Sequence, residues 1–444
     1  MTRPARLLFQ SFVVCGICLT LLLISPNPER PTEAQAHVLA AKDGRQWYRG
    51  NLHTHSLWSD GDDYLEMIAL WYRDHDYDFL SFTDHNVLAT NSNRWIDVAK
   101  KSTGKTALAE LKAAFPGDWV EERERDGKHE IRLKTFEEVS GKMAVPDEFL
   151  LIQGEEVTDR FGRLPVHMNA TNVRELIPPL HGDSVAETMQ NNVNAVIAQR
   201  ERTGQPMFIH LNHPNFGYGV TAEDLMRIRG EKFFEVYNGH PGVNDSGNAQ
   251  HASTERMWDI ILAKRLGEFD LPVMYGLATD DGHSYHKIPS RASEPGRGWV
   301  MVLAEGLEAG TLIESMERGD FYSSSGVFLD RVEATGQSLS VQVRAEEGVE
   351  YRIEFIGTRR GYDSSSKPVI DDKGKEVRAT RIYSDDIGEV LETVEGASAT
   401  YEFNGDELYV RALITSDREH SNPSEIGEFE RAWVQPAIPG KPAE

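Results

Sequence analysis

Cysteine is almost absent from this chain. Its 444 residues contain only Cys15 and Cys18, and both lie in one apolar run, Leu7–Ile24. If that run is removed with the first 36 residues, the mature chain has no disulfide and no thiol nucleophile. The sequence also lacks a Gly-x-Ser-x-Gly elbow, a Walker A loop and a His-Glu-x-x-His motif. A covalent serine or cysteine mechanism therefore has no support in the sequence.

Long hydrophobic runs are missing after residue 24, so no second membrane span is predicted. Arg3 and Arg6 precede the N-terminal run, and Ala34-Gln35-Ala36 offers a small-x-small cleavage site. We expect residues 1–36 to be a signal peptide that exports the protein to the periplasm or the extracellular space. The alternative is an uncleaved anchor, because the run is almost long enough to cross a bilayer.

Basic residues are scarce. The chain has 47 Lys+Arg against 71 Asp+Glu, a formal net charge of −24. A non-specific nucleic-acid binder needs Lys and Arg to displace counterions from phosphates, and an anionic membrane attracts the same residues. We therefore expect no nucleic-acid partner, and membrane contact only through the N-terminal segment. Hydrophobic residues make up 39%, which suits a globular protein.

Strand-like runs alternate with helical patterns between residue 47 and about residue 325. Repeated strand–helix units predict an α/β fold with a mostly parallel sheet or a barrel. Ser253–Gly267 is a clear helical pattern, and Thr221–Asp224 resembles a capping box. The predicted strands are Trp47–His53, Asp78–Thr83, Phe149–Val157, Leu164–Ala170, Met207–Leu211, Phe233–Tyr237, Val273–Thr279 and Trp299–Leu303.

Two segments depart from this rhythm. Residues 98–148 are rich in Lys, Glu, Asp and Gly, and we expect a surface insertion with some helix. After Gly326 the helical patterns largely stop, and alternating runs predict a small β-rich domain over 327–434. The expected domains are thus a signal peptide (1–36), an α/β domain (37–326), the β-rich domain and a loose tail (435–444).

Residues that can bind metal ions recur at the ends of the predicted strands. His53 and His55 close the first strand, and their spacing points both imidazoles to one side. Each such motif alone is as easily a turn cap, but in a β/α barrel the strand ends converge on one face. Other strand ends carry Thr83-Asp84-His85, Gly154-Glu155-Glu156, His210-Leu211-Asn212-His213 and Thr279-Asp280-Asp281-Gly282-His283.

Imidazole and carboxylate ligands without sulfur suit zinc, manganese or iron. The number of candidate ligands implies two or three divalent ions. Such a cluster holds a hydroxide at neutral pH and polarises a phosphoryl or carbonyl oxygen.

The ordered series of motifs resembles that of the PHP-domain metallohydrolases, named after polymerase and histidinol phosphatase. The resemblance covers about residues 47–325. It implies a distorted (β/α)7 barrel with a trinuclear metal centre at the strand ends. The motifs that carry it are Asn51-Leu52-His53-Thr54-His55-Ser56, Ser59-Asp60-Gly61, Thr83-Asp84-His85, Gly154-Glu155-Glu156-Val157-Thr158, His213-Pro214 and Asp281-Gly282-His283.

Three further segments look like the exported, carbaryl-hydrolase-like branch of that family, namely Phe234–Pro241, Pro295–Trp299 and Gly319–Tyr322. The resemblance favours Glu156 over Glu155 and Asp281 over Asp280, which remain the fallbacks. It implies catalytic roles for Asp281 and His283. The implied metal ligands are His53, His55, Asp60, His85, Glu156, His167, His213, Asp281 and His283.

Candidates for substrate contact lie near the same strand ends. Arg297 stands between two glycines, where its planar guanidinium could bind a substrate anion and act in catalysis. The alternative is that it pairs with one of the many carboxylates. Asn238 and His240 end a predicted strand and could touch substrate or a water on the metal. Asp84 could orient His85 or another ligand.

Together these features predict an exported metal-dependent hydrolase, a phosphoesterase that uses metal-bound hydroxide on a small-molecule phosphoester or ester. The nearest alternative is a carbamate, ester or amide hydrolase with the same ions. A third reading is an extracellular binding protein whose metals are structural. The full ligand series argues against it, because a structural metal rarely needs more than four protein ligands.

Overall fold

The computed structural model describes residues 37–40, 44–230 and 232–440. The expected signal peptide and its two cysteines lie outside the described residues. Within the described part, no helix has the length and apolar character needed to cross a membrane.

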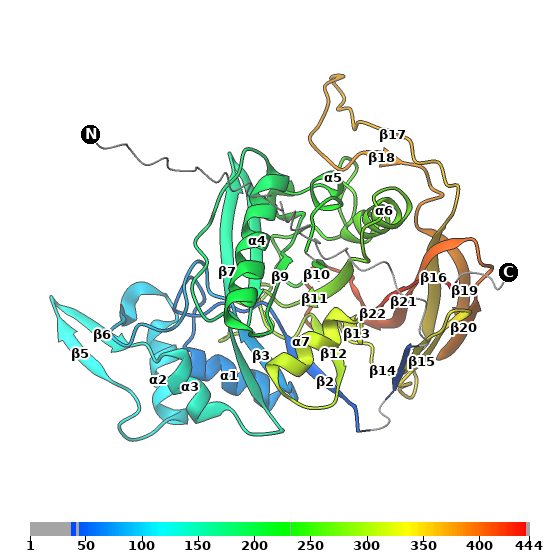
Figure 1. The fold of residues 1–444 in the computed structure, drawn as a ribbon. Helices are drawn as coiled ribbons and strands as arrows, with labels where there is room; N and C mark the ends of the chain where they lie inside the picture. Colours follow the sequence, from blue (N-terminus) through cyan, green and yellow to red (C-terminus); the bar gives the residue numbers. More distant parts are fainter. Residues whose placement is uncertain (1–36, 41–43, 231, 441–444) are drawn as a thin grey trace, which may run out of the picture. The chain divides into compact units, whose positions relative to one another are not determined.

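The fold is mixed α/β and is built on one large mixed sheet of 13 strands (Figure 1). Its first part runs in the order β11-β10-β9-β8-β7-β3-β2. Neighbours pair in parallel, except that β8 is antiparallel to both β7 and β9. These strands are β2 (Gln46–Asn51), β3 (Phe79–Phe82), β7 (Leu150–Phe161), β8 (Leu164–Thr171), β9 (Phe208–Leu211), β10 (Phe233–Asn238) and β11 (Tyr275–Thr279).

Each strand predicted between residues 47 and 303 overlaps an observed strand, because runs of β-branched and aromatic residues coincide with burial on both faces. In β3, β9 and β10 every residue is buried. Such continuous apolar runs are typical of strands covered on both sides. Just beyond the strand ends, Thr54 forms an isolated parallel bridge with Gly282, so the chain after β2 meets the chain after β11.

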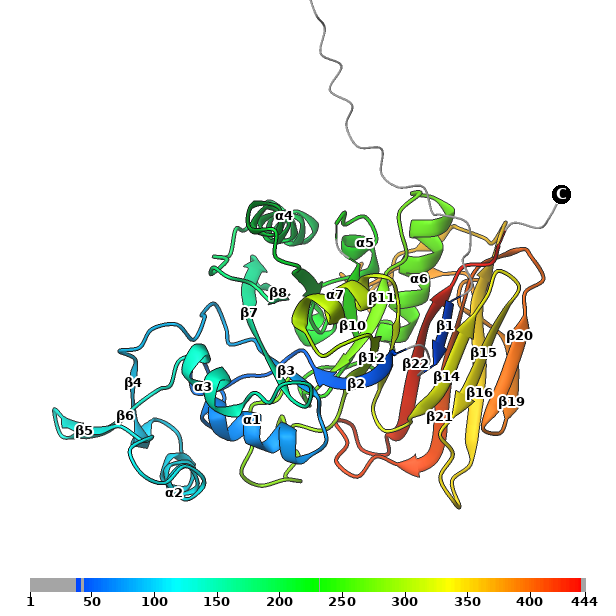
Figure 2. The same ribbon diagram turned by 60° about the horizontal axis from the view of Figure 1, so that its bottom comes forward.

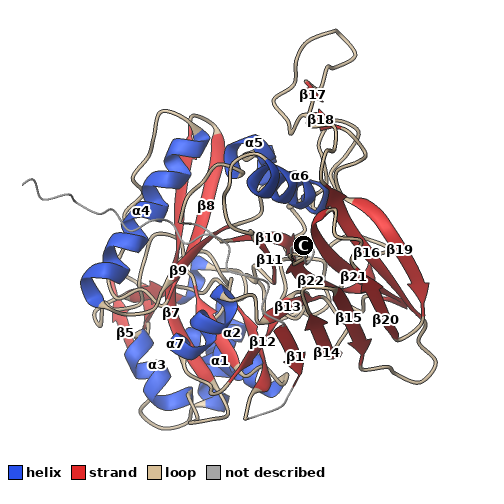
Figure 3. Ribbon diagram, turned by 45° about the vertical axis from the view of Figure 1, so that its right-hand side comes forward, coloured by secondary structure: helices blue, strands red, loops and turns tan. Residues whose placement is uncertain are grey.

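Helices lie beside these strands, whereas the C-terminal part contains strands and loops (Figure 3). Ser184 caps α4 through Glu187 N, and Gly204 ends it in the left-handed conformation. The expected capping box is present, with Thr221 bound to Asp224 N at the start of α5. The helices are α1 (Leu65–Asp74), α4 (Val185–Thr203), α5 (Ala222–Leu225), α6 (Thr254–Gly267) and α7 (Ala309–Glu317), with a short 3₁₀ helix at Phe216–Tyr218.

The expected insertion at 98–148 contains helix, together with two strands of a small sheet of its own, in the order β4-β6-β5. It is anchored rather than loose, since Leu111, Ile131 and Val139 are buried in the same core cluster as α1. Strand β4 (Trp95–Asp97) precedes the insertion, whose own elements are a 3₁₀ turn (Val98–Lys100), α2 (Gly104–Ala114), β5 (Glu122–Arg125), β6 (Lys128–Arg132) and α3 (Phe136–Met143).

The large sheet continues from β2 into the C-terminal region, in the order β12-β13-β22-β21-β16-β19. A second sheet, β1-β14-β15-β20, lies against it (Figure 2). Leu339, Val341, Ile353 and Phe355 are buried in this region. The strands are β1 (His37–Ala40), β12 (Trp299–Ala304), β13 (Phe321–Ser324), β14 (Leu329–Ala334), β15 (Ser338–Val343), β16 (Tyr351–Arg359), β17 (Ser366–Lys367), β18 (Ile382–Tyr383), β19 (Glu389–Glu395), β20 (Ser398–Glu402), β21 (Glu407–Glu419) and β22 (Phe429–Ala437).

A buried ion pair joins α6 to the C-terminal strands. Arg411 on β21 donates to both carboxylate oxygens of Asp259, at 2.8 and 2.7 Å, and Tyr409 donates to the same carboxylate at 2.9 Å. The side chains of Arg411 and Tyr409 are fully buried. The β-rich region therefore packs tightly against the α/β part and shares a sheet with it. The domain boundaries drawn from the sequence stay a prediction.

Candidate metal centre

The nine side chains expected to bind metal all belong to four overlapping groups, in each of which the nitrogen and oxygen atoms lie within 4.8 Å of one another. We call them the His/Asp/Glu cluster. They come from the carboxyl ends of β2, β3, β9 and β11 and from β7 and β8. The groups are His55, Asp60, His85 and His283; His53, His55 and Glu156; His53, His213 and Asp281; and Glu156, His167 and His213.

The inner part of the cluster is closed to solvent. His53 Nε2 and His55 Nε2 are 3.1 Å apart, and each lies 3.2 Å from Asp281 Oδ1. Glu156 Oε2 is 3.4 Å from His55 Nε2. His53, His55 and Glu156 are completely buried, because the strand ends meet around them. A cation bound between these two imidazole nitrogens and the carboxylate oxygen would account for their close approach.

Glu156 also faces the next pair of imidazoles. Its Oε1 lies 3.1 Å from His167 Nδ1 and 3.4 Å from His213 Nε2. One carboxylate thus stands between His55 on one side and His167 and His213 on the other. Glu156 would thus offer one oxygen on the side of His55 and the other on the side of His167 and His213.

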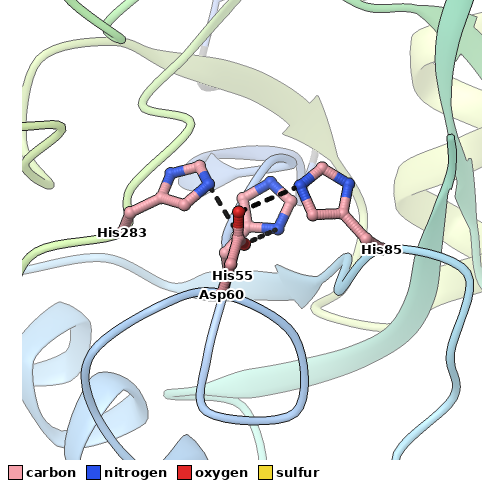
Figure 4. Close-up of side chains that lie close together, drawn as sticks. All are labelled: His55, Asp60, His85 and His283. Carbon is pink, nitrogen blue, oxygen red and sulfur yellow. Dashed lines mark ion pairs between the residues drawn. The ribbon is translucent and has the colours of Figure 1, made fainter. Parts of the chain in front are cut away.

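The outer part of the cluster is open. The side chain of Asp60 is 54% exposed and that of His85 is 27% exposed, whereas those of His53, His55 and Glu156 are not exposed at all. Asp60 Oδ2 lies 3.4 Å from His85 Nε2, and Asp60 Oδ1 lies 3.4 Å from His283 Nε2. Figure 4 shows Asp60 between the two imidazoles, with His55 behind it. The cluster is therefore open to solvent from this side.

Charges within the cluster keep its carboxylates ionised. Burial alone would raise the pKa of Glu156, but His85 and His167 outweigh it and hold that pKa well below its ordinary value. Asp281 follows the same pattern, with burial opposed by His53 and His55. Burial and the neighbouring His283 lower the pKa of His55 to about 3, so its ring is neutral. Ionised carboxylates and a neutral imidazole are the forms that bind metal. Although burial opposes it, the neighbouring carboxylates raise the pKa of His53 and His85, so these two rings would bind an ion with loss of a proton.

Glu235, in the middle of β10, orients the cluster and was not among the sequence-predicted site residues. Its Oε1 lies 2.7 Å from His53 Nδ1, which leaves His53 Nε2 facing Asp281. Its Oε2 accepts from the backbone N–H of His213 at 2.7 Å. This is the carboxylate–histidine arrangement that fixes a ligand's tautomer. The available signal was an ionisable residue inside the apolar run Phe233–Tyr237.

Asp84 and Asn212 also hold the cluster in place. Asp84 accepts from Ser56 N at 2.8 Å and from Ser59 Oγ at 2.5 Å. It therefore fixes the turn that carries Asp60, where the sequence suggested an orienting role. Asn212 donates to Glu156 Oε1 at 2.8 Å.

The two fallback residues point away from the cluster. Glu155 Oε1 accepts from Ile177 N at 2.7 Å. Asp280 accepts from Tyr72 Oη at 2.7 Å and from the backbone of Arg297 at 2.6 Å. The preference for Glu156 and Asp281 agrees with this placement.

The expectation that Arg297 binds substrate needs correction. Its side chain is fully buried and pairs with Glu294 at 3.0 Å, so the alternative of a carboxylate partner is the one found. Asn238 is also fully buried, and its amide donates to Glu235 at 2.8 Å and to Asp281 at 3.2 Å. Both side chains therefore donate their hydrogen bonds to groups of the protein itself. His240 is partly buried, with its ring 5.5 Å from that of His283.

The residues present fit a group of divalent cations. Buried polar atoms are normally hydrogen-bonded. Glu156 Oε2 is buried and takes part in no hydrogen bond within the described chain, although His85 Nδ1 lies 2.5 Å away. A cation bound among these imidazoles would satisfy that carboxylate oxygen. Oxygen and nitrogen donors without sulfur suit zinc, manganese or iron.

No family model and no curated protein matches the chain. Among solved structures, the chain is similar to a two-domain protein from Bacteroides vulgatus that contains a predicted PHP-like metal-dependent phosphoesterase. The identity is 14%, the match covers 92% of this chain and 100% of that one, and the TM-score is 0.37.

Two further structures cover about half of the chain. A protein from Bifidobacterium adolescentis assigned as a metal-dependent phosphoesterase has 12% identity, covers 54% of this chain and 89% of its own, and gives a TM-score of 0.28. An amidohydrolase from Chromobacterium violaceum with bound sulfate and no metal has 14% identity, covers 53% and 87%, and gives 0.26. All three TM-scores lie below 0.5, so these similarities carry no argument, and a proposal about function rests on the geometry of the cluster.

Proposed function

We propose that this protein is an exported metal-dependent phosphoesterase of the PHP type that acts on a small molecule. The observation that carries the proposal is the His/Asp/Glu cluster, whose members span residues 53–283 and meet at the strand ends. Asp281 adopts a left-handed backbone conformation, with φ of 50°. Non-glycine residues held in that region cluster at functional sites. Residues 1–36 would supply the export signal.

The seven strands from β2 to β11 would form the distorted (β/α)7 barrel of residues 37–326. The parallel bridge between Thr54 and Gly282 supports closure at the end that carries the cluster. At the other end, Ser323 and Gln435 each hydrogen-bond to the backbone of Gly276 on β11. Hydrogen bonds from these side chains on β13 and β22 thus replace backbone pairing with β11 at this end. Residues 327–434 would form the β-rich domain.

All members of the cluster would serve as ligands of two or three divalent ions, with Asp281 and His283 closest to the reaction. Bound ions there supply Lewis-acid polarisation of substrate and an activated water. The protein's own residues hold this arrangement. Glu235 fixes the tautomer of His53, and His283 Nδ1 lies 2.8 Å from the Asp281 carbonyl, which turns His283 Nε2 towards Asp60.

Substrate would bind at the open side of the cluster, near Asp60 and His85. His240 remains a candidate for substrate contact, because Gly242 N donates to its Nδ1 at 2.9 Å and the ring packs between His283 and Phe216.

The test is turnover by the purified mature protein after chelator treatment and reloading with manganese or zinc. The panel is 4-nitrophenyl phosphate, a bis(4-nitrophenyl) phosphodiester and 4-nitrophenyl acetate. The proposal expects metal-dependent hydrolysis of a phosphoester. Asp281→Asn should fold normally and lose most of that activity. Unchanged phosphoester turnover by this variant would refute the assignment of Asp281.

One observation favours a second candidate, hydrolysis of a carbamate, ester or amide. Arg297, the guanidinium expected to bind a substrate anion, is committed to Glu294 and backbone groups. An uncharged carbonyl substrate needs no such group. Metal-dependent cleavage of the acyl ester without phosphoester turnover would select this candidate. Tight metal binding with no turnover over the whole panel would instead favour a metal-stabilised binding protein.

A further inference from the structure

Arg297 connects the C-terminal β region to the strand ends that carry the cluster. Its Nε donates to the backbone carbonyl of Asn422 at 3.0 Å, and its Nη2 donates to the Asn422 side-chain oxygen at 3.0 Å. Asn422 lies in the loop between β21 and β22, residues 420–428. Glu294 accepts from the same guanidinium, so the charge is paired although no solvent reaches it.

The same residue also contacts two segments next to Asp281. Its backbone N–H donates to Asp280 Oδ1 at 2.6 Å, immediately before Asp281 in sequence. Its Nη1 donates to the Gly239 carbonyl at 2.7 Å. Gly239 follows Asn238, whose amide donates to Asp281 Oδ2 at 3.2 Å. Movement of Arg297 would therefore be felt at Asp281 by two routes.

Close packing makes this connection stiff. A Cβ atom built on Gly239 would lie 2.8 Å from Arg297 Cβ and 2.9 Å from the Asp280 carbonyl oxygen. No side chain fits there without displacement. The loop 420–428 also contacts the segment 239–253 that follows β10, because Ser246 donates to Glu425 Oε2 at 2.6 Å. Densely packed contacts transmit displacement rather than absorb it.

We propose that Arg297 and Asn422 are positioning residues through which the loop 420–428 fixes Asp281 for metal binding. The C-terminal β region is then part of the metal-binding unit and not an appended module. The inference rests on the proposed function, since it assumes that Asp281 is a ligand. It gives the buried guanidinium a role in metal binding in addition to its role in the stability of the β region.

Two variants of the full chain test it. Asn422→Ala removes the side-chain acceptor but keeps the backbone carbonyl that binds Nε, so the fold should hold. Arg297→Lys keeps a positive charge near Glu294 but cannot reach all of the acceptors at once. The control is Tyr409→Phe, which removes hydrogen bonds to Asp259 and from Thr358 in the junction between α6 and β21.

The measurement is manganese retained per chain, by elemental analysis, over a titration with chelator, together with the Tm of each variant. Loss of partners around a metal ligand commonly weakens binding by 10–100-fold. Arg297 and Asn422 lie one contact further from the metal ligand, so we expect smaller effects. Arg297→Lys should lose half of its manganese at a chelator concentration about tenfold lower than the parent chain does, and Asn422→Ala at one about threefold lower. Tyr409→Phe should lower the Tm and retain manganese as the parent chain does.

Retention equal to the parent in both variants would overturn the inference. Equal loss from Tyr409→Phe would overturn it as well, because general loosening of the junction would then account for the effect. If Arg297→Lys does not fold, Asn422→Ala decides alone. A parent chain that binds no manganese or zinc would instead refute the proposed function itself, and the inference with it.

Discussion

Glu235→Gln should weaken metal binding without replacing any of the proposed ligands. The carboxylate is fully buried and accepts from four donors: His53 Nδ1, His213 N, Asn238 Nδ2 and Thr279 Oγ1, at 2.7 to 2.8 Å. Glutamine has nearly the same volume, so no cavity forms. Its amide nitrogen, however, is a donor where the carboxylate was an acceptor.

The magnitude follows from that mismatch. If the amide oxygen keeps His53 and Thr279, the amide nitrogen faces two buried N–H groups, those of His213 and Asn238. Each donor left unsatisfied costs about 1–3 kcal/mol of folding free energy. The negative charge that stabilises His53 as a ligand is lost too, and ion affinity should fall by about 10–100-fold.

Glu407→Gln is a matched control, because its carboxylate is also fully buried and accepts from Tyr401, from Gly405, and from both the backbone and the side chain of Asn404. It lies at the start of β21, outside the cluster. The assay is a chelator titration of the manganese-loaded proteins, with urea unfolding for stability. Both variants should lose stability, and only Glu235→Gln should lose manganese at lower chelator. Equal retention in the two would refute the reasoning.

Three further predictions concern the whole molecule. Asp259→Ala leaves the buried guanidinium of Arg411 without its carboxylate and should lower the free energy of unfolding in urea by about 3–5 kcal/mol. The double variant Asp259→Leu with Arg411→Met should recover most of that loss, and equal losses in the two proteins would contradict the prediction. Burial and the nearby Arg297 lower the pKa of His420 to about 4, so the unfolded chain binds the proton first as the pH falls below 6.5. Folding free energy should then drop by about 2 kcal/mol more between pH 7 and pH 5 in the parent than in His420→Gln, and parallel pH curves would disprove it. Removing ions held at a free concentration 100-fold above their Kd should lower folding free energy by about 2.7 kcal/mol, seen as a lower Tm that manganese restores; an unchanged Tm would count against binding to the folded state.

The sequence was most informative where local patterns decide the structure. Alternating and continuous apolar runs located the strands from Trp47 to Leu303. The predicted signal peptide, with its small-x-small site at 34–36, lies outside the described residues and stays a prediction. Strand ends of a β/α unit share one side of the sheet by topology, so side chains from residue 53 to residue 283 could be expected to meet there.

Contacts between distant residues could not be read in the same way. Glu235 meets His53 across 182 positions, and a single glutamate within an apolar strand does not reveal its partner. Arg297 stands between glycines, which suggested a guanidinium that could bind a substrate anion. One of its acceptors, Asn422, follows 125 positions later in a region with no catalytic motif. The continuation of the sheet from β2 into the C-terminal region could not be predicted for the same reason, because strand order depends on contacts between residues far apart in the sequence.

The most direct test is a crystal structure of the mature protein loaded with manganese, with anomalous difference density measured near the manganese edge. The account predicts two or three peaks within bonding distance of the histidine and carboxylate atoms at the ends of β2, β3, β9 and β11 and on β7 and β8. A well-ordered map with no peak there, or with manganese bound only elsewhere, would contradict it.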